Sequence, residues 1–285
     1  MTNVEIKEHY ENGKKCRIER EWYPNGNLKS SANYKDDKKD GVVRKYYDNG
    51  NLESEISYKD GKSDGTGRGC YYSGKLCWFA NYKDGKLEGI AREWHRNGKL
   101  KSEVSYRDGE SDGVCRLWYR DGKLASENSY KDGKRDGIAK EYYCNGRPKS
   151  EATWKDGKKD GIEREWNFDG QLRSEIPWKN GKKDGIERGW YPNGQLWLED
   201  TYVDGECNVQ HHMYYGPTGK LSGITEIHDS HDGKREVLLR EFNEDGSIRW
   251  EITHSYDEDV LGLSEQVEFE QHDEDAAQRS DGKRR

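Results

Sequence analysis

Charged side chains recur at fixed intervals along this chain, and such residues can act as acids, bases or anion ligands. One column holds Glu55, Glu103, Glu127, Glu151, Glu175 and Glu199, and another holds Arg20, Arg44, Arg68, Arg92, Arg116, Lys140, Arg164 and Arg188. A catalytic acid or base needs a differentiated, desolvated pocket, and a repeated column on an open surface supplies none. The pattern therefore predicts a solvated or ion-paired glutamate ladder, not an enzyme.

Other chemistry-bearing residues do not assemble into a recognisable site. The Asp-Gly-Lys-x-Asp-Gly segments lack the Gly-Lys-Ser/Thr of a phosphate loop and the ligand spacing of a calcium loop. His228 and His231 lie three residues apart without a third ligand at fixed spacing. None of the six cysteines forms a Cys-x-x-Cys pair, which favours reduced thiols over zinc. We expect no cofactor and no metal.

The overall charge limits the classes of partner. The chain has 49 basic and 56 acidic residues, a net charge of −7 and a pI near 5.7, without a basic block. This balance argues against nucleic acid and against anionic membranes. No run of 18 apolar residues occurs, and the charged segment from Met1 to Tyr10 does not resemble a signal peptide. We expect an intracellular, cytoplasmic protein.

The elements that must position these columns follow from a repeat. Glycines recur every 24 residues in three phases, exemplified by Gly98, Gly109 and Gly113. Within one copy, the segments 89–95 and 100–107 alternate apolar and polar residues, as strands do. The turns between them contain Asn-Gly or Asp-Gly. These features predict an all-β fold, an elongated single-layer antiparallel sheet of hairpins with a 24-residue period, wound as a solenoid.

The first turn predicts the register of each hairpin. Pro24-Asn25-Gly26 is typical of a type I turn followed by a left-handed glycine, a three-residue loop. In the copy at 89–110 this loop pairs Trp94 with Leu100 and Arg92 with Ser102. The arginine and tryptophan columns then share one face, with arginine stacking on indole, and the glutamates lie on the other face. The candidate partner-binding surface is this aromatic–arginine face: Trp22, Arg44, Arg92, Trp94, Trp118, Trp166 and Trp190.

Three regions are expected along the chain. The repeat array spans 1–219, and divergent C-terminal repeats that cap the sheet span 220–262. The segment 263–285 closes the chain as an acidic, disordered tail. Because an open sheet has two edge strands, self-association through those edges is a further expectation, above all at the segment 4–7.

The repeat unit resembles the MORN-variant repeat, the second MORN class. The copy at 92–109 carries the resemblance: Arg-Glu-Trp-His-Arg-Asn-Gly-Lys-Leu-Lys-Ser-Glu-Val-Ser-Tyr-Arg-Asp-Gly. The resemblance covers about 4–219; Cys70, Trp78, Phe79 and Pro148 depart from the pattern. It implies a MORN-like sheet and a non-catalytic scaffold that binds another protein. One form of that role is a structural or capsid-associated protein of a large DNA virus, which would place the protein in a virion. Similar bacterial arrays imply an antitoxin or immunity role as an alternative, and eukaryotic MORN proteins imply peripheral membrane binding as another.

Overall fold

The computed structural model of the 285-residue chain describes residues 3–207, 210–214, 218–229 and 234–257. Throughout these ranges the regular structure is β-strand, without helix.

The N-terminal half of the sheet contains β1 (Asn3–Glu11), β2 (Lys14–Trp22), β3 (Leu28–Lys35), β4 (Lys38–Lys39), β5 (Gly41–Tyr46), β6 (Leu52–Lys59), β7 (Lys62–Cys70), β8 (Leu76–Lys83), β9 (Lys86–Leu87), β10 (Gly89–Trp94), β11 (Leu100–Arg107), β12 (Glu110–Trp118) and β13 (Leu124–Lys131). The C-terminal half contains β14 (Lys134–Tyr142), β15 (Pro148–Lys155), β16 (Lys158–Lys159), β17 (Gly161–Trp166), β18 (Leu172–Lys179), β19 (Lys182–Lys183), β20 (Gly185–Trp190), β21 (Leu196–Val203), β22 (Glu206–Cys207), β23 (Gln210–Tyr214), β24 (Leu221–Asp229), β25 (Lys234–Phe242) and β26 (Ile248–Asp257).

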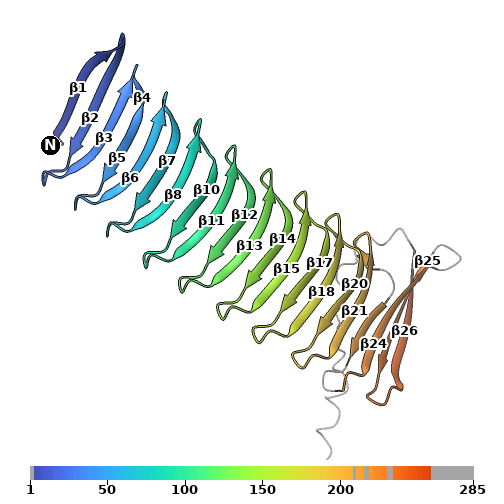
Figure 1. Ribbon diagram of the computed structural model, residues 1–285. Helices are drawn as coiled ribbons and strands as arrows, with labels where there is room; N and C mark the ends of the chain where they lie inside the picture. Colours follow the sequence, from blue (N-terminus) through green and yellow to red (C-terminus); the bar gives the residue numbers. More distant parts are fainter. Residues whose placement is uncertain (1–2, 208–209, 215–217, 230–233, 258–285) are drawn as a thin grey trace, which may run out of the picture.

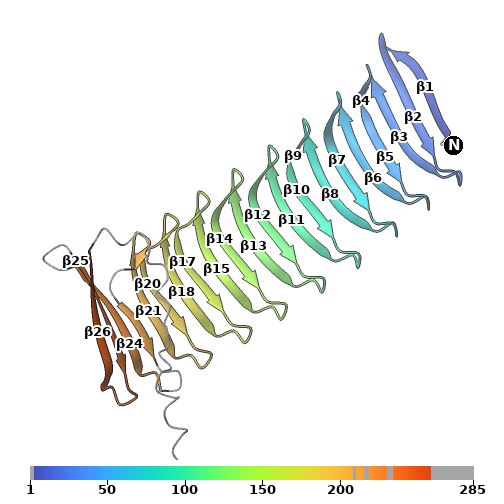
Figure 2. The same cartoon turned by 180° about the vertical axis from the view of Figure 1, so that it is seen from behind.

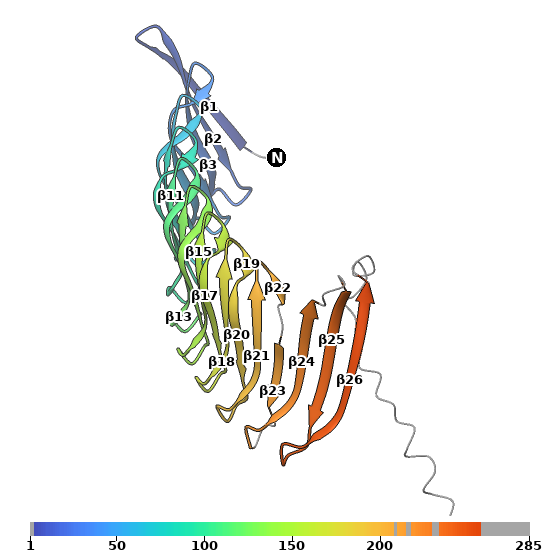
Figure 3. The same cartoon turned by 90° about the vertical axis from the view of Figure 1, so that its right-hand side faces the viewer.

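The strands form one antiparallel sheet in chain order. Each long strand inside the sheet pairs with the long strand before it and the long strand after it. Each two-residue strand pairs only with the strand that precedes it, as β15 pairs with both β16 and β17. Figure 1 shows the sheet running from β1 to β26 as a long twisted ribbon, and Figure 2 shows it from behind. Figure 3 shows that the sheet is a single curved layer that does not close on itself. The predicted all-β fold, a single-layer antiparallel sheet of hairpins, is confirmed, and its winding as a solenoid stays a prediction.

Two kinds of turn alternate along the sheet. In the first, the Gly98 N–H donates to the His95 carbonyl and the His95 N–H donates to the Lys99 carbonyl, which is the predicted type I turn with a left-handed glycine at φ +88°. In the second, Asp108 and Gly109 both have positive φ, 51° and 88°. That geometry defines a tight two-residue turn that asparagine, aspartate and glycine tolerate best.

The predicted register is correct at the turn and wrong beyond it. Trp94 pairs with Leu100, but Glu93 then pairs with Ser102 and Arg92 with Glu103, because Lys101 is an extra residue in β11. Such a bulge reverses the face of every later residue in its strand relative to the partner. The glutamate column therefore lies on the same face as the arginine column, not on the opposite one.

The sheet has two faces, a ladder face and a tyrosine face. The ladder face bears Arg92 and Glu103 and their equivalents, together with Ile90 and Trp94 by alternation along β10. The tyrosine face bears Val104 and the Tyr106 column. The predicted set of Leu100, Ser102, Val104 and Tyr106 on one face is thus split by the bulge.

The sheet has little buried core. Among described residues none of the large side chains is fully buried, and the buried side chains are small or polar: Cys16, Ala80, Ser102, Ser126, Asn128, Ala152 and Asp200. All except Cys16 occupy the Ser102 or Val104 position of their repeat, on the tyrosine face. Stability therefore depends on half-buried aromatic rings and on contacts between neighbouring repeats.

The two ends of the sheet differ in how they continue the repeat array. The first described strand, β1, pairs only with β2, and its Val4 and Ile6 are more than half exposed. Strands β24–β26 continue the sheet beyond residue 219. The expected division at residue 219 and association through β1 stay predictions, and the segment 263–285 lies outside the described residues.

Candidate functional site

Ion pairs between basic and acidic side chains recur from hairpin to hairpin on the ladder face. Arg92 Nε lies 2.7 Å from Glu103 Oε2, and Arg116 contacts both Glu103 at 3.7 Å and Glu127 at 2.5 Å. The equivalent pairs are Arg44–Glu55, Arg68–Glu55, Lys140–Glu151, Arg164–Glu175, Arg188–Glu199 and Arg240–Glu251. The predicted ion-paired glutamate ladder is confirmed, with arginine as its partner.

The ladder is a surface feature, so its contribution to stability is modest. The side chains of Arg92 and Glu103 retain 39% and 21% of their accessible area. Water and salt screen such pairs, and each contributes roughly 0–1 kcal/mol. What the ladder provides is a fixed row of alternating charges with a spacing set by the strands, about 4.8 Å per strand.

The tryptophans predicted for the candidate surface lie beside this ladder. Trp22, Trp94, Trp118, Trp166 and Trp190 each occupy the last position of their strand before the first type of turn, and each is half-buried. Arg44 and Arg92 lie two residues before that position in their own repeats. The structure therefore brings all seven predicted residues to one face. Binding by them stays a prediction.

Stacking of cations on rings occurs on the opposite face. Arg135 lies 4.9 Å from the centroid of the Trp154 ring, and Lys159 lies 4.6 Å from that of Trp178. Arg17 over Tyr34, Lys39 over Tyr58 and Lys183 over Tyr202 repeat the arrangement. Among the described residues, no cation–π contact joins the arginine column that contains Arg92 to the tryptophan column that contains Trp94. The prediction that arginine stacks on indole within these two columns is therefore wrong.

Burial on the tyrosine face alters the chemistry of its phenols and thiols. Desolvation raises the pKa of Tyr82, Tyr106 and Tyr202 above the ordinary tyrosine value. For Tyr202, the carboxylates of Glu187 and Asp200 raise the pKa further. A raised pKa keeps these phenols neutral at physiological pH.

The third copy differs from its neighbours on both faces. Trp78 takes the place of a serine on the tyrosine face and lies directly over Gly69, where a Cβ would collide with its indole nitrogen. Gly67 gives similar room, because a Cβ there would lie 2.9 Å from the Tyr82 ring. On the ladder face, Phe79 takes the position of the glutamate. Trp78 is thus accommodated by the glycines at 67 and 69 of the neighbouring strand.

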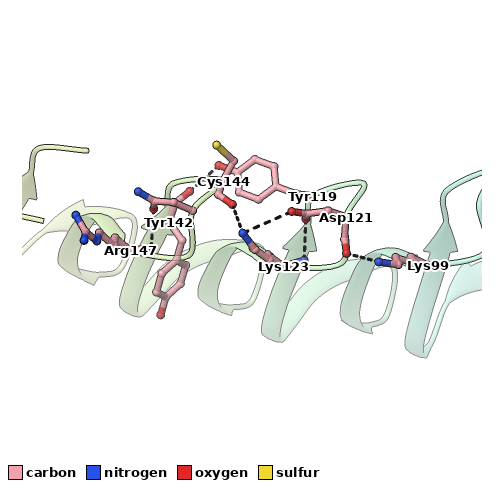
Figure 4. A network of polar contacts seen from close by, with 8 residues as sticks. Lys99, Tyr119, Asp121, Lys123, Tyr142, Cys144 and Arg147 are labelled. Atoms are coloured by element: carbon pink, nitrogen blue, oxygen red, sulfur yellow. Dashed lines mark hydrogen bonds and ion pairs between the residues drawn. The ribbon is translucent and has the colours of Figure 1, made fainter. Parts of the chain in front are cut away.

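Side chains at the turns connect each repeat to the next. The Tyr119 hydroxyl donates to the Tyr142 carbonyl at 2.6 Å, and Lys123 Nζ donates to the Cys144 carbonyl at 2.8 Å. Figure 4 shows this row, with Lys99 reaching Asp121 in the same way. Tyr23, Tyr47, Tyr71 and Tyr143 make the hydroxyl contact in their own repeats. These contacts are structural, so the turns are tied together rather than poised around a ligand.

Within the described ranges, no three His, Cys, Asp or Glu residues gather closely enough to hold a metal ion. The described part of the chain has no helix that is long and apolar enough to cross a membrane.

These features define an open, single-layer β-hairpin repeat protein with two accessible faces. The family model described as "MORN repeat variant" matches seven segments, 18–36, 39–60, 87–108, 111–132, 135–156, 159–180 and 183–204. The chain therefore belongs to the MORN repeat variant family, whose members are repeat proteins, generally non-catalytic, usually involved in protein or membrane interactions. The unmatched stretch between 60 and 87 is the divergent third copy.

Other comparisons add little. None of the curated proteins matches this chain. Among solved structures, a porin-like protein from Bacteroides uniformis ATCC 8492 is 12% identical over 89% of this chain and 93% of its own. The TM-score of that alignment is 0.18, too low to support an argument.

Proposed function

We propose that this protein is a non-catalytic scaffold that binds another protein along the ladder face. The observation that supports this most is the ladder itself, a repeated row of charged side chains on a curved sheet, bordered by half-buried tryptophans. Extended repeat surfaces of this kind suit large partners, because contacts add up repeat by repeat.

Exposed apolar side chains support the same face. Ile138, Ile162 and Ile186 occupy one position in successive repeats and retain 47%, 41% and 38% of their accessible area. They lie on the ladder face, where Ile162 pairs with Pro177 and Ile186 with Thr201. Apolar stripes bordered by charge are typical of protein interfaces.

Narrower roles fit within this proposal. A structural or capsid-associated protein of a large virus and an antitoxin that neutralises a partner protein both need such a surface, inside a cell or a virion. Peripheral membrane binding is the alternative class. The net charge of −7 disfavours contact with anionic lipid.

The test uses the full chain as bait in its source cell, followed by reconstitution with each co-purified protein. Light scattering after size exclusion should show a complex of defined stoichiometry. Flotation with liposomes of neutral and anionic lipid provides the second arm. Binding to liposomes without any stoichiometric protein complex would contradict the proposal and favour the membrane alternative.

A further inference from the structure

The alternation of charge along the ladder is broken at Phe79. From Arg116 to Arg188, each base lies between two glutamates in the strand register. Phe79 instead pairs with Arg68 on one side and with Arg92 on the other. Each of these arginines therefore has a carboxylate neighbour on one side only.

The two arginines at this gap are accessible and carry excess charge. Arg68 contacts Glu55 at 3.1 Å with 52% of its side chain exposed, and Arg92 contacts Glu103 at 2.7 Å with 39% exposed. Glu55 is also shared with Arg44 at 2.5 Å. The uncharged phenyl ring of Phe79, between Arg68 and Arg92, does not neutralise the charge of either arginine. A carboxylate placed over Phe79 would supply the negative charge that Glu103, Glu127 and Glu151 supply at the same position in later repeats.

A second gap of the same kind lies two repeats earlier. Ser31 pairs with Arg20 and with Arg44, where the alternating pattern would place a glutamate. Side chains of Arg20 and Arg44 retain 40% and 43% of their accessible area. Ser31 and Phe79 are four strand spacings apart, which is about 19 Å.

We propose that these gaps form a binding site for an acidic partner segment. Two carboxylates on the partner occupy the Ser31 and Phe79 positions, each between two arginines of this chain. An extended peptide rises about 3.3 Å per residue, so acids about six residues apart span the two gaps. The inference rests on the proposed scaffold function and deepens it by naming the site and the chemistry of the partner.

Two linked contacts give this arrangement its selectivity. A single exposed ion pair contributes little, but a second carboxylate on the same peptide binds at a high effective concentration. The apolar ring of Phe79 favours a segment with an apolar group next to one acid. Between Arg116 and Arg188 every base has a glutamate on both sides. Farther along, Ile224 pairs with His212 and Arg240, so one of its two flanking bases is a histidine. The two gaps flanked by arginine on both sides therefore lie in the N-terminal half.

The probe is a fluorescein-labelled peptide with two glutamates separated by five serine and threonine residues. Fluorescence anisotropy at low ionic strength measures its binding to the full chain. A peptide with glutamine in place of both glutamates, and one with the two glutamates adjacent, test charge and spacing. We expect the widely spaced glutamates to bind at least fivefold more tightly than either control.

Variants that supply the missing acid locate the site. Phe79→Glu and Ser31→Glu restore the pattern of other repeats and should each weaken probe binding at least fivefold without loss of folding. Leu117→Glu is the matched control. It adds the same charge at an exposed position on the tyrosine face, where Glu93 and Glu141 stand in neighbouring repeats, and it should change binding less than twofold.

The outcomes separate this inference from the proposed function. Equal probe binding by Phe79→Glu and the natural chain would overturn the site, as would equal binding of the glutamine peptide. Recovery of a stoichiometric protein complex is measured independently with the same variants. A complex that forms unchanged with both acid-restoring variants keeps the scaffold and rejects the gaps as its contact.

Discussion

Arg92 and Glu103 face each other across β10 and β11, with 2.7 Å between Nε and Oε2. This pairing shows that the two charged columns share one face. The pairing recurs along the sheet because each hairpin has one extra residue at the same position, shortly after its first turn.

The first prediction concerns the strength of this pair. Glu103→Gln should lower the free energy of unfolding by less than about 1 kcal/mol, since both side chains are partly exposed. A double-mutant cycle with Arg92→Gln, measured by urea unfolding, should give a coupling that shrinks as salt rises. A coupling of several kcal/mol that is insensitive to salt would contradict a solvent-screened ladder.

The second prediction tests the contact between Trp78 and Gly69 in the third copy. Gly69→Ala should destabilise the sheet by about 1–3 kcal/mol, because its Cβ meets the Trp78 indole. In a Trp78→Ser background the same substitution should cost much less. Thermal unfolding followed by circular dichroism measures both. Equal costs in the two backgrounds would show that Trp78 does not lie over Gly69.

The third prediction concerns an unsatisfied indole. Trp178 Nε1 donates to Glu163 at 2.9 Å, whereas Trp154 Nε1 is buried without a hydrogen-bond partner, since Ala139 stands where Glu163 would. Ala139→Glu should therefore raise stability by about 1 kcal/mol. The control is the same substitution in Trp154→Phe, which lacks the donor and should gain less. Similar gains in both chains would assign the effect to something else.

The fourth prediction concerns alkaline pH. The pKa of Tyr202 is raised in the folded protein by burial and by neighbouring carboxylates, so the neutral phenol is favoured there. Its contribution to stability is present below the unfolded pKa of about 10 and is lost as pH rises above that value. Tyr202→Phe should reduce this loss between pH 9 and 12, as measured by urea midpoints. An identical pH profile for the two chains would argue against a buried phenol.

Much of the fold could be predicted from the sequence, because glycine phase and strand alternation repeat together. The Trp94–Leu100 pairing followed from turn chemistry. The bulge at Lys101 did not, since Leu100, Ser102, Val104 and Tyr106 alternate as an unbroken strand would. One signal was available: the arginine and glutamate columns have complementary charge, and cross-strand pairing of opposite charges is favourable.

The gaps at Ser31 and Phe79 could not be predicted from the sequence, because the bulge that shifts the strand register could not be predicted. Their meaning depends on which arginines flank them, and that follows only from the shifted register. Sequence comparison of the copies shows that Phe79 departs from the pattern, but not that it separates Arg68 from Arg92. The covering of Gly69 by Trp78 also required the bulge, because it brings the two residues onto one face.

Small-angle X-ray scattering of the full chain tests the open, single-layer sheet most directly, and every proposed contact depends on that sheet. We predict a skewed pair-distance distribution with a long tail and a radius of gyration well above about 19 Å, the value for a compact domain of this length. A symmetric distribution with a radius of gyration near 19 Å would contradict the account.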